Sequence, residues 1–263
     1  MRIDFKSRYG PWAVVAGGSS GIGSAIATQI AAQGIDLVLL DRDGVALEQA
    51  ADHIRAAHDV DVRVGVVELA GVSALPEVQE VVEGTEVGLF VADTMRPSGG
   101  DLFIRRSLEQ TLQMVTMNCQ TVVALSHYLG RKMASRHRGG LILTAPQDAS
   151  AGSAYMAAEN ATKAFSLVLA EGLWIELGQF DVDVLTVPAA PIDRAETKAA
   201  APSEMATAAL DALGNTGPWT MTSTDGQTAE QAWATDRVAL MERLTKAAAV
   251  LSDLPPLRMP SRT

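Results

Sequence analysis

Residues 12–43, WAVVAGGSSGIGSAIATQIAAQGIDLVLLDRD, constrain the fold more than any other part of the chain. An apolar run leads into a glycine-rich turn, an alanine-rich segment of helical character follows, and a second apolar run ends on Asp41. This order predicts a strand, a helix and a second, parallel strand. Glycines let the backbone approach a pyrophosphate, and the N–H groups at the start of a helix favour its negative charge. The turn residues expected against the phosphates are Gly17, Ser19, Ser20, Gly21, Ile22 and Gly23.

Asp41 stands about twenty residues after the turn, where a carboxylate can accept a hydrogen bond from a ribose 2′-hydroxyl. The same charge repels a 2′-phosphate, so Asp41 favours NAD over NADP. The strand, the turn, the helix and the acid in this order indicate a dinucleotide site. A glycine-rich turn in some other α/β protein is the alternative.

Composition limits what the rest of the chain can be. With 263 residues, 48% of them hydrophobic, one large core and a single domain are expected. A net charge of −10 without a basic cluster argues against nucleic acid and against an anionic membrane surface. The single cysteine, Cys119, excludes an internal disulfide, and no apolar run reaches the length of a membrane span. The N-terminal residues contain no apolar signal core, so a cytoplasmic protein is expected.

The histidines and the cysteine indicate no metal site, because their spacing does not match that of metal ligands. Cys119 is interpreted as a small apolar residue. The histidines, interpreted as surface or packing residues, are His53, His58, His127 and His137.

After residue 43 the chain continues to alternate apolar runs with helical patterns. This alternation predicts an α/β fold, a single Rossmann-like domain with a doubly wound parallel sheet and ligands at the carboxyl ends of the strands. From residue 188 the alternation stops, and alanine-rich helices at 195–213 and 228–251 are expected to cover this edge. Residues 1–187 would bind the dinucleotide, and residues 188–263 would cover the substrate. The further strands are expected at 62–69, 87–92, 140–145 and 182–187, and the helices at 45–58, 75–83, within 103–137, and at 156–177.

The chain resembles the short-chain dehydrogenase/reductase family over nearly its whole length. AGGSSGIG resembles the family's TGxxxGIG, VGLFVADTM lies where the family has a strand ending in NNAG, and VDVLTVPAAPID resembles its strand ending in PG. LLDR, MNC, GGLILTAP and ATKAFSLVLAEGLWIEL are similar to the second strand, the asparagine segment, the serine strand and the catalytic helix. The resemblance implies a catalytic tetrad of asparagine, serine, tyrosine and lysine.

Only two members of that tetrad are present. The resemblance places the asparagine at Asn118 and the lysine at Lys163. The tyrosine position, four residues before the lysine, is Glu159, and the serine position is Pro146. In the family the tyrosine exchanges a proton with the substrate oxygen while hydride moves to or from the nicotinamide. Ordinary carbonyl reduction by this tetrad is therefore not expected.

The resemblance also implies the surroundings of the cofactor. The glycine-motif residue whose hydroxyl in the family ties the turn to the NNAG strand is Ala16, and NNAG has become residues 92–95. Asp93 places a negative charge near the dinucleotide, which weakens binding or demands a partner; a solvated loop acid is the alternative. Arg42 is a residue that the family often uses for a 2′-phosphate, which moderates the preference for NAD. The positions implied beyond the turn are Asp41, Arg42, Glu68, Leu69, Ala92, Asp93, Lys163, Pro188 and Ile192.

Two residues are candidates to replace the missing relay. If the helix already runs at Tyr155, then Tyr155, Glu159 and Lys163 share one face; otherwise Tyr155 lies in the loop that enters the helix. Glu159 is either half of an inert helix-surface salt bridge or a general base or acid. The Lys163 ammonium favours an ionised carboxylate and burial favours a neutral one, a contest that the sequence leaves open.

Three functions follow. The first is acid–base chemistry without hydride transfer, such as isomerisation, elimination or hydration, by Glu159 and Lys163 on a hydrophobic carbonyl or hydroxyl compound. The second is an NAD(P)-dependent oxidoreductase with a non-standard proton relay through Glu159 or Tyr155. The third is a catalytically silent partner subunit or sensor.

The resemblance implies association through the long helices, as a homodimer or homotetramer, or as a heteromer with an intact relative. Both helices carry apolar stripes, made of Leu108, Leu112, Val115, Phe165, Val168, Leu169 and Leu173. The covering segment suggests an apolar pocket for the substrate. Its expected lining is Met95, Ile192, Met205, Trp219 and Met221.

Overall fold

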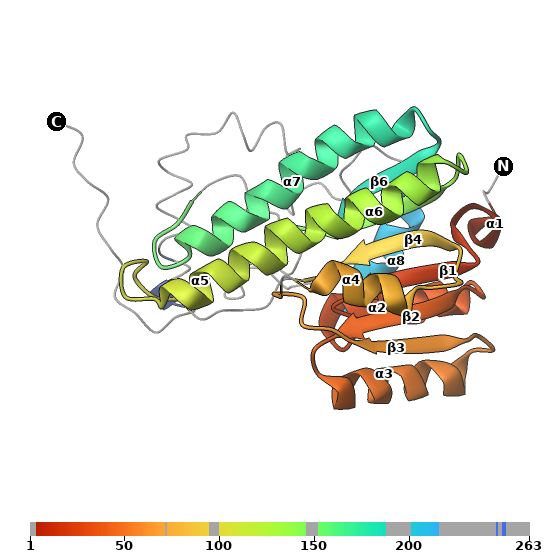
Figure 1. The fold of residues 1–263 in the computed structure, drawn as a ribbon, viewed down its shortest axis with the longest axis horizontal. Coiled ribbons are helices and arrows are strands. Elements are labelled where there is room, and N and C mark those ends of the chain that lie inside the picture. Colours follow the sequence, from red (N-terminus) through yellow and green to blue (C-terminus); the bar gives the residue numbers. More distant parts are fainter. Residues whose placement is uncertain are drawn as a thin grey trace.

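The computed structural model describes residues 4–71, 73–94, 100–145, 152–187, 201–215, 246, 249 and 250. Among these residues, six parallel strands form one sheet in the order β3-β2-β1-β4-β5-β6 (Figure 1). The chain moves outward from β1 to β3, returns to the centre, and continues from β4 to β6. This is the doubly wound Rossmann-like arrangement, so the expected fold class is confirmed.

The elements follow the predicted order. The strands are β1 (Trp12–Ala16), β2 (Asp36–Asp41), β3 (Val62–Val66), β4 (Val87–Ala92), β5 (Gly139–Thr144) and β6 (Val182–Val187). The α-helices are α1 (Phe5–Tyr9), α2 (Gly21–Ala32), α3 (Gly44–Ala57), α4 (Ala74–Val81), α5 (Leu108–Val115), α6 (Val122–Ala134), α7 (Ala157–Gly178) and α8 (Pro202–Ala212). A π-helical segment, η1 (Thr116–Thr121), joins α5 to α6.

The third strand is shorter than the sequence suggested. It stops at Val66, three residues before the expected end at Leu69. Val67 and Leu69 are nevertheless buried, because they pack into the core on the α4 side of the sheet. The segment after Val66 is therefore a loop whose apolar residues are buried, and this burial explains why its sequence pattern indicated a strand.

Alternate residues of the central strands pack into two separate cores. Val15 and Leu39 belong to the cluster with residues of α2, α3 and α8, whereas Val14 and Leu40 belong to the cluster with residues of α4, α6 and α7. Successive strand side chains point to opposite faces, and helices cover both faces here. The strands therefore appear in the sequence as continuous apolar runs.

The helices α5 and α6, joined by η1, continue along one line beside α7 (Figure 1). This line of helices and α7 each extend past the carboxyl ends of the strands. Part of the expected association stripe is exposed, namely Leu108, Leu112, Phe165 and Val168. Leu169 and Leu173 instead pack against the core. The oligomeric state stays a prediction.

The C-terminal region is described only in part. The helix α8 packs with residues of α2 and with Leu185 of β6, so it extends the helical layer on that face of the sheet. Met205, expected in the substrate pocket, is buried in this core. The other expected pocket residues and all but three residues of 228–251 lie outside the described residues.

None of the helices within the described ranges combines the length and the apolar character that crossing a membrane requires.

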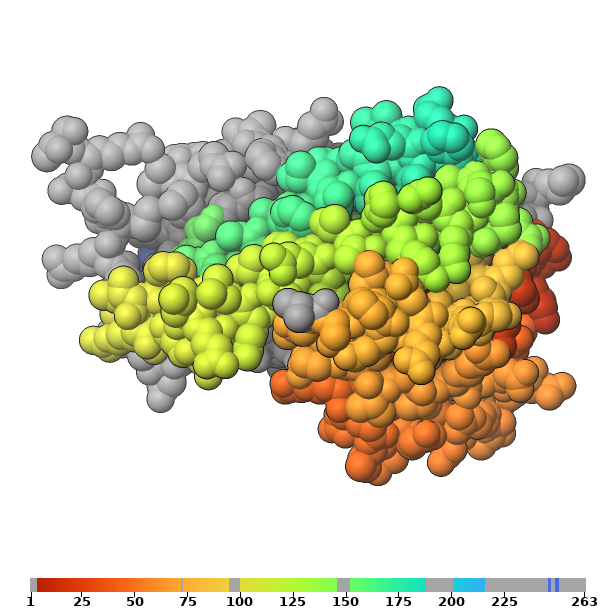
Figure 2. Space-filling view, in the orientation of Figure 1, coloured from red at the N-terminus to blue at the C-terminus, as the bar shows by residue number. Residues whose placement is uncertain are grey.

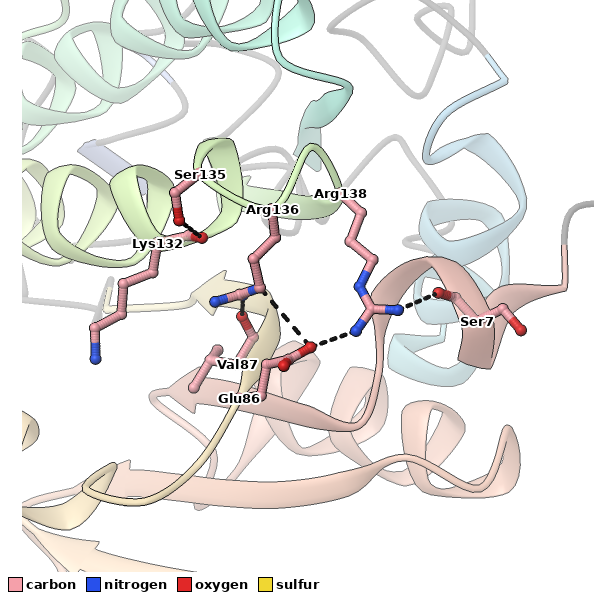
Figure 3. Close-up of polar contacts among 7 residues, drawn as sticks. All are labelled: Ser7, Glu86, Val87, Lys132, Ser135, Arg136 and Arg138. Carbon is pink, nitrogen blue, oxygen red and sulfur yellow. Dashed lines mark hydrogen bonds and ion pairs between the residues drawn. The ribbon is translucent and has the colours of Figure 1, made fainter.

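A cluster of charged residues lies at the amino-terminal end of β4. Glu86 pairs with Arg138 and lies 3.8 Å from Nε of Arg136 (Figure 3). Arg136 Nη2 donates to the Val87 carbonyl at 2.6 Å, and Arg138 Nη1 donates to the Ser7 carbonyl at 3.3 Å. The cluster ties α1, the start of β4 and the connection from α6 to β5 together, and it is structural.

Candidate functional site

The glycine-rich turn has the shape that the sequence predicts. Gly17 has φ +87° and Gly21 has φ +63°, backbone conformations that favour glycine. A Cβ at Gly17 would overlap the Asp93 carbonyl, and one at Gly23 would overlap the Gly17 carbonyl. A Cβ at Gly21 would meet none of the described residues within 4 Å. The turn therefore packs closely on the end of β4 and is open on its outer side.

The amino end of α2 is suited to an anion. Its N-cap, Ser20, makes no side-chain hydrogen bond to the helix, and the first turn contains no acidic residue. Ile22 is buried, whereas Ser20 and Gly21 are exposed. Uncapped N–H groups at such an end bind phosphate through hydrogen bonds and the helix dipole.

Asp41 ends β2 beside this turn and is only 2% exposed. Its Oδ2 accepts a hydrogen bond from the Ser19 hydroxyl at 2.5 Å, and its Oδ1 accepts from the Arg42 backbone N–H at 2.7 Å. As a carboxylate, Asp41 accepts both of these hydrogen bonds. The structure brings Ser19 and Asp41 into contact, whereas the Arg42 side chain is exposed.

The two residues expected on the adenine side behave differently. Glu68 is exposed, and its carboxylate accepts from the Ala70 backbone N–H at 3.1 Å. Leu69 is buried, and its carbonyl accepts from the Thr121 hydroxyl at 2.6 Å. The segment after β3 is thus tied to η1, with Glu68 outside.

Asp93 is not the solvated loop acid that was one alternative. Its Oδ2 accepts from the Gly23 backbone N–H at 2.8 Å, and its Oδ1 accepts from the Thr144 hydroxyl at 3.0 Å. Burial raises the pKa of Asp93 to about 6, against the effect of these two hydrogen bonds, and the charge of Asp41 adds to the rise. Asp93 therefore takes a helix N–H that could otherwise face a pyrophosphate.

Thr144, at the end of β5, was missed by the sequence reasoning. Its single hydroxyl proton is shared between Asp93 and the carbonyl of the buried Ala92, which lies 3.1 Å from the hydroxyl oxygen. Asp93 and Thr144 thus join the turn to the end of β4, where the resemblance implies a contact through a hydroxyl at the position of Ala16. The apolar pattern of β5 gave no signal that a hydroxyl at its end would have this role.

The helix α7 places Glu159 and Lys163 one turn apart. Lys163 Nζ lies 2.7 Å from Glu159 Oε1, and the two side chains are 9% and 7% exposed. An exposed helix-surface salt bridge is therefore the wrong interpretation, because the pair is buried. Glu159 and Lys163 are thus directly paired inside the protein.

Asn118 is brought to this pair by η1. Its Nδ2 donates to the Thr162 hydroxyl at 3.0 Å, and Thr162 donates to the Glu159 carbonyl at 2.9 Å. The Asn118 Oδ1 is buried and has no hydrogen-bond partner among the described residues. Buried acceptors of this kind are normally satisfied, and π-helical turns often occur at functional sites. Asn118 is therefore tied through Thr162, which the sequence reasoning missed, to the backbone of the helical turn that carries Glu159 and Lys163.

Asn160 is a second polar residue of this region that was missed. Its Nδ2 donates to the Ser153 hydroxyl at 2.9 Å, and its Oδ1 is buried without a partner in the described part of the chain. Two buried amide oxygens, Asn118 Oδ1 on η1 and Asn160 Oδ1 in the first turn of α7, thus lack a hydrogen-bond partner among the described residues.

Tyr155 does not stand on the helix. The helix α7 begins at Ala157 with Met156 as its N-cap, and Tyr155 precedes both with φ +65°, a strained conformation for a bulky residue. Its backbone carbonyl accepts from the Asp101 N–H at 3.2 Å. The hypothesis of one face shared with Glu159 and Lys163 is wrong, and the loop position is confirmed.

Three expected site residues, Pro146, Pro188 and Ile192, lie outside the described residues. Within the described ranges, no group of three or more His, Cys, Asp and Glu side chains is arranged to hold a metal ion.

A family model described as short chain dehydrogenase matches residues 11–206. A 7beta-hydroxysteroid dehydrogenase of Clostridium sardiniense is 26% identical over 187 residues, 71% of this chain and 71% of that protein. The Mus musculus protein called inactive hydroxysteroid dehydrogenase-like protein 1 is 26% identical over 166 residues, 62% of this chain but only 50% of that protein.

Solved structures show the same fold. A structure from work on 7beta-hydroxysteroid dehydrogenase stereoselectivity superposes with a TM-score of 0.77 at 22% identity, over 88% of this chain and 98% of that chain. A short-chain dehydrogenase from Sphingobium yanoikuyae in complex with NADPH gives a TM-score of 0.76 at 22% identity, over 96% of this chain and 99% of that chain.

Proposed function

The chain belongs to the short-chain dehydrogenase family, and from that premise we propose that it binds a nicotinamide dinucleotide and transfers protons, without net redox change, through Glu159 and Lys163. The observation that carries the proposal is the buried Glu159–Lys163 ion pair, which stands where the family has a tyrosine and a lysine. A carbonyl or hydroxyl compound of hydrophobic character is the proposed substrate. The names of the hydroxysteroid relatives make steroid ketones the first compounds to test.

The residues present fit the adenosine and phosphate end of a dinucleotide. The open outer side of the turn at Gly21 and the N–H groups at the start of α2 other than that of Gly23, which Asp93 already accepts, would receive the pyrophosphate, and Asp41 would accept from the ribose. In family members with a complete tetrad, the bound nicotinamide supplies or accepts a hydride. Here the dinucleotide is proposed as a bound ligand, with NAD favoured over NADP by the Asp41 charge.

The Asp41→Asn variant tests the ligand and its selectivity. We expect NADH affinity to fall about tenfold or more, because a charge-assisted hydrogen bond is lost, and the preference for NADH over NADPH to shrink because the repelling charge is gone. Calorimetric titration with both dinucleotides measures this. The exposed acid Glu48 on α3 supplies the control, Glu48→Gln, which should leave both affinities unchanged. Unchanged NADH binding in Asp41→Asn would contradict the proposed ribose contact.

The proposed reaction moves protons only. The Glu159 carboxylate removes a proton from a carbon next to the substrate carbonyl, so that a C–H bond breaks and an O–H bond forms. The electron pair passes to the carbonyl oxygen, which takes a proton from Lys163 Nζ. Glu159 then returns its proton to a carbon of the enol, the enol O–H gives its proton back to Lys163 Nζ as the carbonyl re-forms, and the isomerisation is complete with no oxidant or reductant consumed.

Proton exchange tests this reaction without knowledge of the product. In D₂O the protein should catalyse deuterium incorporation next to the carbonyl of a steroid ketone, as followed by NMR. Glu159→Gln keeps a similar shape but removes the base, and a loss of about 10²-fold or more is expected. Glu171→Gln, which changes another acid of α7, should exchange as fast as the wild type. Exchange that survives in a folded Glu159→Gln protein would overturn the role of Glu159.

A catalytically silent dinucleotide-binding subunit is the second candidate. Direct pairing of Glu159 with Lys163 favours it, as does the family relationship to proteins called inactive. Under this alternative, NADH binds in a manner that depends on Asp41, while no tested ketone exchanges deuterium. The two experiments together thus separate the candidates.

A further inference from the structure

A groove runs between α4 and α6, away from the site described above. Its volume is about 660 Å³, within the range of small-molecule pockets. Figure 2 shows this face, where the yellow-green atoms of α6 border the orange atoms of α4. None of its lining residues belongs to the glycine-rich turn or is one of Asn118, Glu159 and Lys163.

The lining changes in character along the groove. Val123 and Ala124, with Leu75 of α4 among the lining, make the amino end of α6 apolar, whereas Arg131 and Lys132 make its carboxyl end basic. The α6 residues lie in two neighbouring rows with a spacing of four residues, so they face the groove together. From residue 123 to residue 132 a helix rises about 14 Å, which an unbranched chain of about ten carbons with a charged head spans.

The charge in the groove is of one sign. Arg131 and Lys132 line it, and no Asp or Glu is among the lining residues that the structure describes, although the chain carries a net charge of −10. Lys132 Nζ donates to the Tyr128 hydroxyl at 2.7 Å, and Arg131 makes no ion pair with a described residue. Figure 3 shows Lys132 pointing away from Glu86, Arg136 and Arg138. Cations also suit the end of a helix, but this does not explain the apolar surface that continues from them.

We propose that the groove binds a small amphipathic anion, an unbranched apolar chain with a carboxylate head. The chain lies along Val123 and Ala124, and the carboxylate meets Arg131 and Lys132. Guanidinium and ammonium groups form charge-assisted hydrogen bonds with carboxylates, and chain burial supplies the hydrophobic part of the affinity. This site does not depend on the proposed proton-transfer function.

Titration with decanoate, below the concentration at which it forms micelles, tests the proposal. The wild type should bind it saturably, and decan-1-ol, which lacks the charge, should bind at least tenfold more weakly. The double variant Arg131→Gln/Lys132→Gln should lower decanoate affinity at least tenfold. Arg105→Gln, which removes an exposed cation outside the groove, is the matched control and should bind as the wild type does.

A second variant tests the apolar end. Ala124→Trp fills this end with a large side chain, so decanoate affinity should fall several-fold while affinity for acetate stays unchanged. Absence of saturable decanoate binding to the wild type, or equal affinity in the double variant, overturns the proposal. So does a change of oligomeric state of the double variant in sedimentation velocity, because that result assigns the groove to an interface between two copies of this chain.

Discussion

Replacing Lys163 with methionine is expected to lower the free energy of unfolding by about 3–5 kcal/mol. The side chains of Lys163 and Glu159 are both less than 10% exposed and their charged atoms are 2.7 Å apart. Removal of the ammonium leaves the carboxylate buried without that counter-charge, and desolvation of a lone charge is costly. Urea unfolding at pH 7, followed by circular dichroism, measures the loss.

A double-mutant cycle separates the pair from simple packing effects. The variant Glu159→Gln/Lys163→Met should recover most of the stability that Lys163→Met loses, because the double variant buries no charge from this pair. Asp52→Asn, which breaks the exposed pair of Asp52 with Arg55 on α3, serves as the comparison and should change stability by less than about 1 kcal/mol. Additive single effects would contradict a coupled buried pair.

The second large effect is a dependence of stability on pH that Asp93 imposes. Burial raises the pKa of Asp93 from its ordinary value of 3.8 to about 6. Below pH 3.8 the Asp93 carboxyl is protonated in both the native and the unfolded protein. As the pH rises through 6, the native protein must hold a buried charge, and the stability that the protonated carboxyl contributed is lost. One pKa unit corresponds to about 1.4 kcal/mol, so up to about 3 kcal/mol is involved.

The Asp93→Asn variant exposes this contribution because its amide never ionises. The unfolding free energy of the variant minus that of the wild type should increase by up to about 3 kcal/mol between pH 4 and pH 8. Asp59→Asn, which changes an exposed acid after α3, should give a difference that stays flat over this range. A flat difference for Asp93→Asn as well would show that the Asp93 charge is not penalised. The same variant should bind NADH more tightly, since it removes a negative charge beside the turn.

The sequence determined the fold and the phosphate end of the site. Residues 12–43 combine glycine spacing, helical pattern and a terminal acid, all local features that dictate one βαβ unit. Five of the six strands are buried on both faces, so each of these is marked by an apolar run in the sequence, whereas Arg63 and Val66 of the edge strand β3 are exposed. Substitution of the tyrosine and serine positions by Glu159 and Pro146 was equally visible, because the helix pattern after Lys163 fixes the alignment.

Tertiary structure decided the state of the side chains at the reaction end. Spacing placed Glu159 and Lys163 on one face of a helix, but burial of that face depends on η1 and on the packing of α7 against it. Tyr155 lies outside the helix and has a left-handed backbone conformation. No residue type near it in the sequence predicts that conformation.

Asp93 shows the same division between sequence and structure. Its place after β4 was evident from the sequence, whereas its two partners, the Gly23 N–H and the Thr144 hydroxyl, come from segments that are 70 and 51 residues away along the chain. The sequence alone thus determined which elements form and in what order, because those depend on local patterns. Only the tertiary structure decided which polar groups are buried together, because that depends on contacts between elements that are distant in the sequence.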